Sequence, residues 1–372
     1  MFQSLAAPLI ALTWQQSVMI GVGLALMYMA IARDLEPSLL LPMGFGTLLV
    51  NLPLSSALTQ GLTEGALSML FRVGIETELF PLLIFIAVGA MCDFTPLLTN
   101  PRMFLFGLTA QAGIFFTMGL ALFLGFDLHE AASIGIIGAA DGPTSIYVSN
   151  RFAPHLLGPI SVAAYTYMAL VPLIQPPVIR LLTSRQERAM KMAYAPKPVS
   201  KRGLIAFPVV VTVVAGLVAP ASVALLGFLM FGNLLRVSGC TERLSRAAQN
   251  ELANIVTILL GFSIAAVMTG ERFVRPETLL IIAMGLVAFV LDTAGGVLSA
   301  KALNLLLPEG RKINPMIGAA GISAFPMSSR VIQRMGQEAD KGNFLLMHAV
   351  GANVSGQIGS VLAGGLLLAF LS

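Results

Sequence analysis

The sequence has little charge for its length. Of its 372 residues only 11% are Asp, Glu, Lys or Arg, whereas 56% are hydrophobic. A soluble domain carries roughly 25% charged residues, so this composition excludes an ordinary soluble protein and indicates an integral membrane protein. The small net charge of +4 is explained by basic cytoplasmic loops, and we expect no nucleic-acid partner.

Cysteine and histidine are also scarce. Two cysteines, Cys92 and Cys240, exclude a disulfide framework, and the three histidines lie far apart and outside any zinc-type motif. We expect both cysteines to be small, buried apolar residues. No Lys or Arg precedes Arg33. The sequence therefore lacks the basic start of a signal peptide, and we expect the first span to be retained.

Apolar stretches recur along the whole chain. Most are long enough to cross a hydrocarbon core of roughly 30 Å as a helix, and no alternating pattern of barrel strands is visible. We therefore predict an all-α polytopic membrane protein with about nine to eleven membrane segments. Residues 56–78 are amphipathic, and we expect them at the membrane interface. The segments are roughly 16–32, 37–53, 79–98, 102–126, 131–150, 156–182, 203–237 (one long or two short spans), 252–271, 277–306, 314–330 and 343–371.

A polar, basic stretch interrupts the chain at residues 184–202. This excess of Lys and Arg predicts a cytoplasmic location. It is either a simple determinant of topology or a docking surface for a cytoplasmic partner or anionic lipid. We divide the chain into N-terminal spans with an interfacial segment, a first repeat, this linker and a second repeat, at residues 1–78, 79–183, 184–202 and 203–372.

The two halves resemble each other. "LLIFIAVGAM" at 82–91 matches "LLGFSIAAVM" at 259–268, and "IGAA" occurs at 137–140 and again at 317–320. Such duplication is typical of transporter repeats. The repeats are inverted if residues 131–150 enter the membrane and return to the same side and if residues 203–237 cross the membrane twice. If either condition fails, the repeats are parallel. We predict inverted repeats, each with a broken or re-entrant helical hairpin.

Both IGAA motifs contain residues that break helices. The hairpin motifs are 137–148, "IGAADGPTSIYV", and 314–330, which contains "IGAAGISAFPMS". Proline removes a backbone donor, and unpaired backbone groups must line a protein-enclosed cavity rather than face lipid. Paired breaks in two halves predict a binding site near the middle of the membrane. The hinge residues are Gly138, Gly142, Pro143, Pro315, Gly318, Gly321 and Pro326.

Asp141 lies inside the first break. An Asp at the centre of a membrane helix costs roughly 2.5–3.5 kcal/mol on insertion scales, so it either caps a half-helix or binds a cation. Nearby oxygen donors suit a hard monovalent cation such as Na⁺. Single Ser and Thr residues often bond their own helix instead, and Asn residues often join helices. The donors are Thr144, Ser145, Tyr167, Asn314, Ser323, Ser328, Asn353 and Ser355.

Two further charged residues fall in apolar surroundings. Arg330 either anchors at the interface or binds a carboxylate with its bidentate fork. Asp292 is either a member of the site or the partner of Lys301 or Arg330.

Three blocks carry a resemblance to a known family. They are "GAADGPTSIYVSNRFAPHLLGPISVAAYTYMALVPLIQPPVIRLLT" (138–183), "INPMIGAAGISAFPMSSRVIQR" (313–334) and "HAVGANVSGQIGSVLAGG" (348–365). From about residue 75 onward the chain resembles the beta subunit of the biotin-dependent sodium-pumping decarboxylases. Their substrates include oxaloacetate, methylmalonyl-CoA, glutaconyl-CoA and malonate.

The resemblance implies a function and an assembly. The chain would decarboxylate carboxybiotin with consumption of a proton and export Na⁺. Its partners would be a carboxyltransferase alpha subunit, which selects the acid, a biotin carrier protein and a small single-span gamma- or delta-type subunit. The family fold implies a homotrimer with inverted repeats, in a bacterial or archaeal cytoplasmic membrane. The family's functional positions match Asp141, Tyr167, Asn314, Gly318, Ser323, Arg330 and Asn353.

We assign expected roles to these residues. Asp141, Asn314 and Asn353 hold one Na⁺, and Thr144 is a further ligand. Tyr167 and Ser323 form a second Na⁺ site or a catalytic proton path, and Arg330 orients carboxybiotin. The alternatives are a Na⁺-coupled secondary transporter of an organic anion and a non-catalytic membrane anchor. Costly polar residues within apolar spans argue against the anchor.

Overall fold

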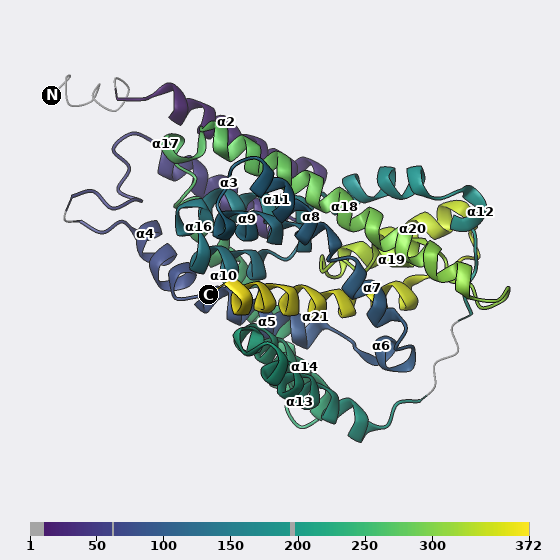
Figure 1. The fold of residues 1–372 in the computed structure, drawn as a ribbon. Helices are drawn as coiled ribbons and strands as arrows, with labels where there is room; N and C mark the ends of the chain where they lie inside the picture. The colour runs from purple at the N-terminus through teal and green to yellow at the C-terminus, as the bar shows by residue number, and fades with distance from the viewer. Residues whose placement is uncertain (1–10, 62, 194–197, 372) are drawn as a thin grey trace.

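The structure, a computed structural model, describes residues 11–61, 63–193 and 198–371. The start of the expected N-terminal unit and residues 194–197 of the expected linker lie outside the described residues. The described elements are helical (Figure 1). The longer ones are α2 (Trp14–Arg33), α3 (Pro37–Asn51), α5 (Leu79–Met91), α7 (Met103–Thr109), α8 (Ala112–Phe123), α9 (Leu128–Gly135), α10 (Gly142–Phe152), α11 (Leu157–Leu182), α13 (Lys201–Val218), α14 (Val223–Ser238), α16 (Ala253–Ala265), α18 (Pro276–Leu306), α20 (Met327–Ala339) and α21 (Leu346–Leu371). Short helices connect them: α4 (Ala66–Phe71), α6 (Thr95–Thr99), α12 (Arg185–Arg188), α15 (Glu242–Ala247), α17 (Gly270–Phe273) and α19 (Met316–Ala319).

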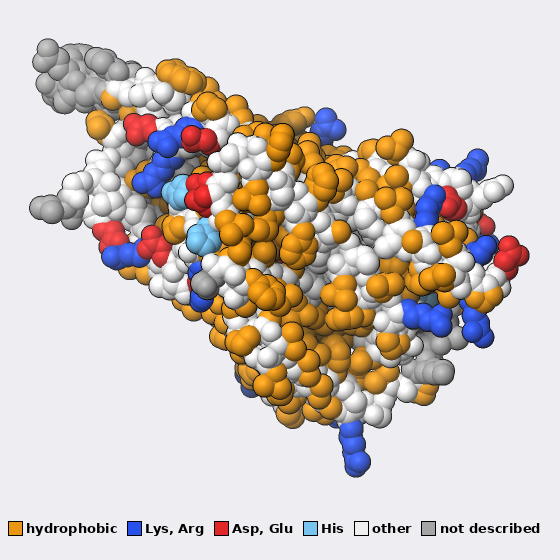
Figure 2. Space-filling view, viewed as in Figure 1, with side chains coloured by type: hydrophobic (Ala, Val, Ile, Leu, Met, Phe, Trp, Pro, Cys, Tyr) orange, Lys and Arg blue, Asp and Glu red, His pale blue; other side chains and the backbone are white. Residues whose placement is uncertain are grey.

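The described part of the chain forms a polytopic membrane protein. It has seven helices long and apolar enough to cross a membrane, or eight if the bent pair at 66–76 and 79–91 counts as one span. This is fewer than the nine to eleven expected segments, because 37–53, 131–150, 252–271 and 314–330 form shorter or broken helices. Figure 2 shows hydrophobic side chains along the middle of the molecule and charged side chains gathered toward its two ends. The stretch 203–237 forms two helices, α13 and α14.

The two halves pack on each other reciprocally. The last helix of the first half, α11, packs against α18 of the second half. The last helix of the second half, α21, packs against α7 of the first half. The two helices contacted in this way differ. In the first half the helix is interrupted between α7 and α8, whereas α18 of the second half is continuous. This exchange fits two related halves, while the inverted orientation of the repeats stays a prediction.

Both IGAA motifs are broken where the sequence predicts. In the first, a short 3₁₀ turn over Ile136–Ala139 follows α9, Ala140 adopts a left-handed conformation with φ 51°, and α10 begins at Gly142. Pro143 lies in the first turn of α10, where its missing N–H costs nothing. In the second, α19 ends at Ala319, and an irregular stretch with a cis peptide bond before Pro326 leads into α20.

The second hairpin packs on its neighbours through glycine. A Cβ on Gly318 would lie 1.8 Å from the carbonyl oxygen of Gly296 in α18. A Cβ on Gly321 would lie 2.2 Å from the carbonyl oxygen of Phe106 in α7, and Gly356 of α21 approaches Gly321 as closely. Small residues allow such backbone contact between membrane helices. The break is therefore enclosed by protein on three sides.

One expectation about the cysteines is wrong. Cys92 is buried as predicted, at 0% exposure, but Cys240 is exposed. Cys240 follows Gly239, whose left-handed φ of 74° ends α14, so the thiol lies outside the helix.

Candidate functional site

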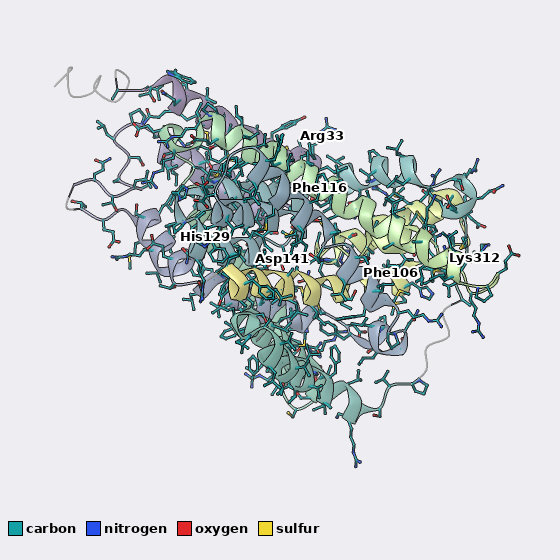
Figure 3. The ribbon with its side chains drawn as sticks, in the orientation of Figure 1. Arg33, Phe106, Phe116, His129, Asp141 and Lys312 are labelled. Carbon is teal, nitrogen blue, oxygen red and sulfur yellow. The ribbon has the colours of Figure 1, made fainter. Side chains whose placement is uncertain are left out.

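Asp141 occupies the N-cap of the second half of the first hairpin. Its Oδ2 accepts hydrogen bonds from Thr144 Oγ1 and from Ser360 Oγ, each at 2.8 Å. Its Oδ1 accepts the Thr144 backbone N–H at 3.4 Å. The residue is only 5% exposed and lies between the two polar ends of the molecule (Figure 3). The carboxyl group is thus held by hydroxyl and backbone donors, with no Lys or Arg partner among the described residues.

The two breaks meet beside Asp141. Ser323 of the second break donates through its Oγ to the Ala139 carbonyl oxygen of the first at 2.6 Å, and its backbone N–H donates to the same oxygen at 3.3 Å. Because the half-helices end here, their carbonyl groups need donors from elsewhere. Joining the breaks in this way links any movement of one hairpin to the other.

Helix α21 supplies a polar stripe that faces the breaks. Asn353 Nδ2 donates to the carbonyl oxygens of Ala320 and Ile322, at 3.2 and 2.7 Å. Gln357 Nε2 donates to the Ser323 carbonyl oxygen. These residues and Ser360, at positions i, i+4 and i+7, lie on one face of the helix.

A cavity of about 170 Å³ adjoins Asp141. We call it the Asp141 cavity. Two buried oxygens near this site, Asn353 Oδ1 and Tyr165 Oη, have no hydrogen-bond partner in the described part of the chain. Carboxylate, amide, hydroxyl and carbonyl oxygens are the donors that a hard cation prefers. Besides Asp141, polar side chains that line the cavity are Glu36, Ser38, Thr257, Tyr165, Ser323 and Gln357.

A second cavity, of about 320 Å³, contains Arg330. We call it the Arg330 cavity; its other charged lining residues are Asp34, Glu36 and Arg334. Arg330 is exposed, and it does not line the Asp141 cavity. Burial raises the pKa of Glu36, although the charge of Arg330 opposes the shift.

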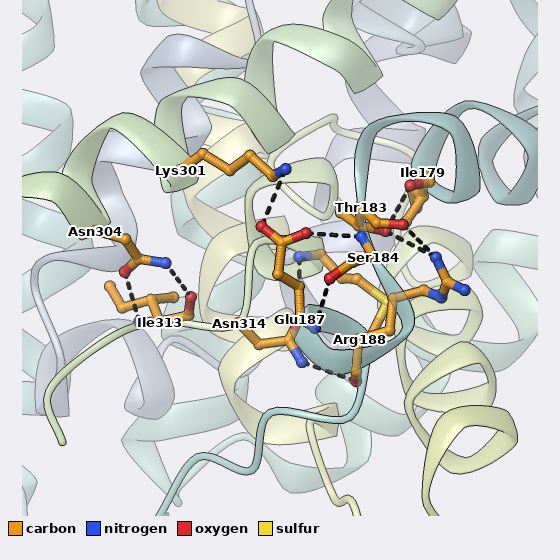
Figure 4. A network of polar contacts seen from close by, with 10 residues as sticks. Ile179, Thr183, Ser184, Glu187, Arg188, Lys301, Asn304, Ile313 and Asn314 are labelled. Atoms are coloured by element: carbon orange, nitrogen blue, oxygen red, sulfur yellow. Dashed lines mark hydrogen bonds and ion pairs between the residues drawn. The ribbon is translucent and has the colours of Figure 1, made fainter. Parts of the chain in front are cut away.

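Two of the expected site residues lie elsewhere. The Tyr167 hydroxyl donates to the Ile282 carbonyl oxygen of α18, so it does not line the Asp141 cavity. Asn314 Nδ2 donates to the carbonyl oxygen of Arg188 at 3.0 Å (Figure 4). It also donates to that of Met190 at 2.9 Å. Asn314 thus fastens the basic linker to the start of the second hairpin, and the structure does not bring it to Asp141.

The remaining predicted oxygen donors bond carbonyl and amide oxygens. Ser145 donates to the Asp141 carbonyl oxygen at 2.9 Å, and Ser355 donates to that of Met103 at 3.0 Å. Ser328 donates to Gln175 Oε1 at 3.0 Å. In this structure these three hydroxyls make hydrogen bonds within and between helices, as the alternative to cation binding predicts.

One of the two interpretations of Asp292, an ion pair with Lys301 or Arg330, is not found in the described part of the chain. Lys301 pairs with Glu187 at 3.0 Å, and Arg330 lies in its own cavity. Asp292 instead accepts the backbone N–H of Gly113, next to the interruption between α7 and α8. A carboxylate is favourable at a helix N-terminus, but this contact accounts for one oxygen only, because Asp292 Oδ2 is buried and has no hydrogen-bond partner among the described residues.

Sequence reasoning missed polar residues of the site, among them Ser360, which bonds Asp141, and three residues that line the Asp141 cavity. Ser360 and Gln357 could have been found, since they share a helix face with Asn353. Tyr165 packs against Gly142, where a Cβ would lie 2.2 Å from its ring, and Glu36 comes from a turn more than 100 positions before Asp141. No sequence signal links these last two to the hairpin, because only the folded chain brings them together.

Comparison with known proteins identifies the family. A model of the family described as the Na⁺-transporting oxaloacetate decarboxylase beta subunit matches residues 15–371. The chain is 51% identical to the methylmalonyl-CoA decarboxylase subunit beta of Veillonella parvula, covering 98% of this chain and 95% of the relative. It is 50% identical to the glutaconyl-CoA decarboxylase subunit beta of Acidaminococcus fermentans, covering 97% and 95%. It is 45% identical to the oxaloacetate decarboxylase beta chain 2 of Salmonella typhimurium, covering 96% and 95%. The chain is thus a polytopic helical membrane protein with a buried carboxyl group where two helix breaks meet. It belongs to the beta-subunit family of the Na⁺-transporting decarboxylases.

Proposed function

We propose that this chain decarboxylates carboxybiotin, consumes one proton in doing so, and couples the reaction to Na⁺ export. The observation that carries the proposal is Asp141: a buried carboxyl at the crossing of two helix breaks, held by hydroxyl donors and adjoining a cavity. A buried carboxylate without a basic partner is costly unless a cation or a proton neutralises it. Exchange of Na⁺ and a proton at one carboxyl group is the simplest coupling that such a site allows.

We assign the Na⁺ site to oxygens near Asp141. Asn353 Oδ1 is buried and unpartnered among the described residues, and Thr144 and Ser323 bring hydroxyl groups to the two breaks. Such an oxygen-rich site suits Na⁺. The predicted roles of Asn314 and Tyr167 in ion binding or proton transfer need a rearrangement, because both side chains are engaged elsewhere.

We assign carboxybiotin to the Arg330 cavity. The Arg330 guanidinium can bind a carboxylate through two parallel hydrogen bonds, and its exposure leaves it accessible to a prosthetic group on another protein. Withdrawing the carboxylate from water weakens the bond to the ureido nitrogen. Export of one Na⁺ against 100 mV requires about 2.3 kcal/mol, which the decarboxylation must supply.

The proposal includes partners and a location. A carboxyltransferase alpha subunit and a biotin carrier protein would generate and deliver carboxybiotin, and a small gamma- or delta-type subunit would join them. We place the chain as a homotrimer in a bacterial or archaeal cytoplasmic membrane. The basic linker marks the cytoplasmic side by the positive-inside rule, the side from which a soluble biotin carrier would approach.

The test is CO₂ release from carboxybiotin by the purified membrane complex, with Na⁺ or with choline at equal ionic strength. We expect Na⁺ to stimulate release and Asp141→Asn to abolish the stimulation. Asp93→Asn, which removes an exposed carboxylate beside Arg236, should behave as the parent. Release that ignores Na⁺, or no release from a well-folded complex, would contradict the proposal and favour a Na⁺-coupled carrier of an organic anion, to be tested by anion uptake into vesicles.

A further inference from the structure

Glu36 lies between the two cavities. Only Glu36, among the described residues, lines both the Asp141 cavity and the Arg330 cavity. The cavities are neighbours along α11, because Met168 lines the first and Ala169 the second. The same holds near the start of α20, where Phe325 lines the Asp141 cavity and Met327 lines the Arg330 cavity.

The fold alone does not explain a glutamate at this position. Glu36 is the N-cap of α3, but its side chain makes no capping hydrogen bond, and Ser, Thr, Asp and Asn are the preferred caps. Its φ of 38° is left-handed, a conformation that costs a residue with a Cβ some strain and that clusters at functional sites.

The Glu36 carboxyl group also has no polar partner among the described residues. It is half-buried, and it forms no hydrogen bond or ion pair with a described residue. The charge of Arg330 acts on it from α20 and that of Asp34 from its own turn. The titratable groups that share a cavity with it are Asp34, Asp141, Tyr165, Arg330 and Arg334.

We propose that Glu36 is the proton donor for decarboxylation, passing a proton from the Asp141 cavity to the substrate held in the Arg330 cavity. This inference rests on the proposed function. As the bond between the ureido nitrogen and the carboxylate carbon breaks, its electron pair stays on nitrogen and CO₂ leaves. The nitrogen takes the Glu36 proton. The resulting Glu36 carboxylate is then reprotonated by the proton that has replaced Na⁺ at Asp141.

The placement suits this role for two reasons. Proton transfer requires a group within reach of both the source and the acceptor, and of the described residues Glu36 is the one that borders both cavities. A carboxyl group that burial keeps protonated above its ordinary range is a better donor near neutral pH. The negative Glu36 left after transfer would be stabilised by Arg330, which the departing carboxylate has freed.

The experiment compares Glu36→Gln, Glu36→Asp and the parent in the intact complex, by CO₂ release from carboxybiotin between pH 5 and pH 9. We expect Glu36→Gln to lose at least tenfold in turnover and Glu36→Asp to recover part of it. The parent should lose activity as pH rises through the pKa of Glu36, because the protonated form is the donor. This alkaline limb should shift in Glu36→Asp and vanish from the residual activity of Glu36→Gln. Glu242→Gln, which removes an exposed acid paired with Arg246, should match the parent.

Na⁺ binding separates this inference from the proposed function. The Na⁺ concentration that protects the complex from tryptic cleavage should be the same within twofold in Glu36→Gln and the parent, since the Asp141 ligands are intact. Turnover of Glu36→Gln within twofold of the parent, or an unchanged alkaline limb in Glu36→Asp, would overturn the role of Glu36 while leaving the proposed function in place. A parent that shows no Na⁺-dependent release would overturn both.

Discussion

The hydrogen bond from Ser360 to Asp141 allows a sharp test of the ion site. Ser360 Oγ and Thr144 Oγ1 both lie 2.8 Å from Asp141 Oδ2. The Na⁺-bound state needs an ionised Asp141, and a donor hydrogen bond favours the ionised form. Replacing Ser360 by Ala removes one of these two side-chain donors. We therefore expect Ser360→Ala to weaken Na⁺ binding without abolishing it.

The size of the effect follows from the strength of such bonds. A hydrogen bond to a charged group contributes about 1.5–3 kcal/mol, and about 1.4 kcal/mol corresponds to a tenfold change in affinity. The Na⁺ concentration for half-maximal CO₂ release should accordingly rise about tenfold to a hundredfold. Maximal turnover at saturating Na⁺ should stay within about threefold of the parent, because Thr144 and the Arg330 cavity are unchanged.

The assay is a Na⁺ titration of CO₂ release at constant ionic strength. Ser149→Ala is the matched control: Ser149 is equally buried, but its hydroxyl donates only to the carbonyl oxygens of Ser145 and Ile146 in its own helix. It should leave the Na⁺ dependence unchanged. A Ser360→Ala complex with the parent's Na⁺ dependence would refute the reasoning and place the cation away from Asp141 Oδ2.

Three further predictions concern packing, the linker and the cysteines. Gly318→Ala places a methyl group against backbone atoms and should destabilise the protein by about 1–3 kcal/mol. In the control Gly119→Ala the new methyl group meets nothing within 4 Å, and stability should change by less than about 1 kcal/mol. Thermal unfolding in detergent compares the two variants. Burial raises the pKa of Glu187, but hydrogen bonds to the carboxylate outweigh burial and lower it overall. Its contribution to linker docking should therefore be present at neutral pH and lost only as pH falls through the lowered pKa. Hydrogen exchange of residues 184–193, expressed as protection relative to the intrinsic rate at each pH, should show this loss in the parent, whereas Glu187→Gln should have lower protection at neutral pH and lack this pH dependence. A maleimide should label the folded chain at the exposed thiol, and Cys240→Ser should abolish this labelling.

Sequence reasoning predicted what depends on local chemistry. Proline fits the first turn of a helix better than its interior, and Pro143 lies in the first turn of α10, within the predicted break. The cost of burying Asp141 is also a local property, and it marked the site. Asn353 was found because an amide in an apolar helix needs a partner, and its partners are the carbonyl groups of the second break.

What sequence reasoning missed depends on which elements meet in space. Tyr167 and Tyr165 are two positions apart on α11, so they point in different directions, and only packing decides that Tyr165 borders the Asp141 cavity while Tyr167 reaches α18. Asn314 is polar and close in sequence to the break, yet its side chain binds the linker. Glu36 belongs to a turn that composition marks as an ordinary surface loop.

The residues of the site differ in how cleanly they can be tested. Asn353 and Gln357 supply donors to carbonyl groups that the helix breaks leave unpaired, and an unpaired buried carbonyl costs about 1–3 kcal/mol. Substituting either residue changes the stability of the hairpin together with any effect on ions. Ser360 and Glu36 carry no such task for the second break. Ser360 bonds the Asp141 carboxylate, and the Glu36 side chain forms no hydrogen bond with the part of the chain that the structure describes. Loss of function in the Ser360 and Glu36 variants can therefore be attributed to ion or proton handling. We expect these variants to discriminate among mechanisms, which substitution of Asn353 or Gln357 cannot do.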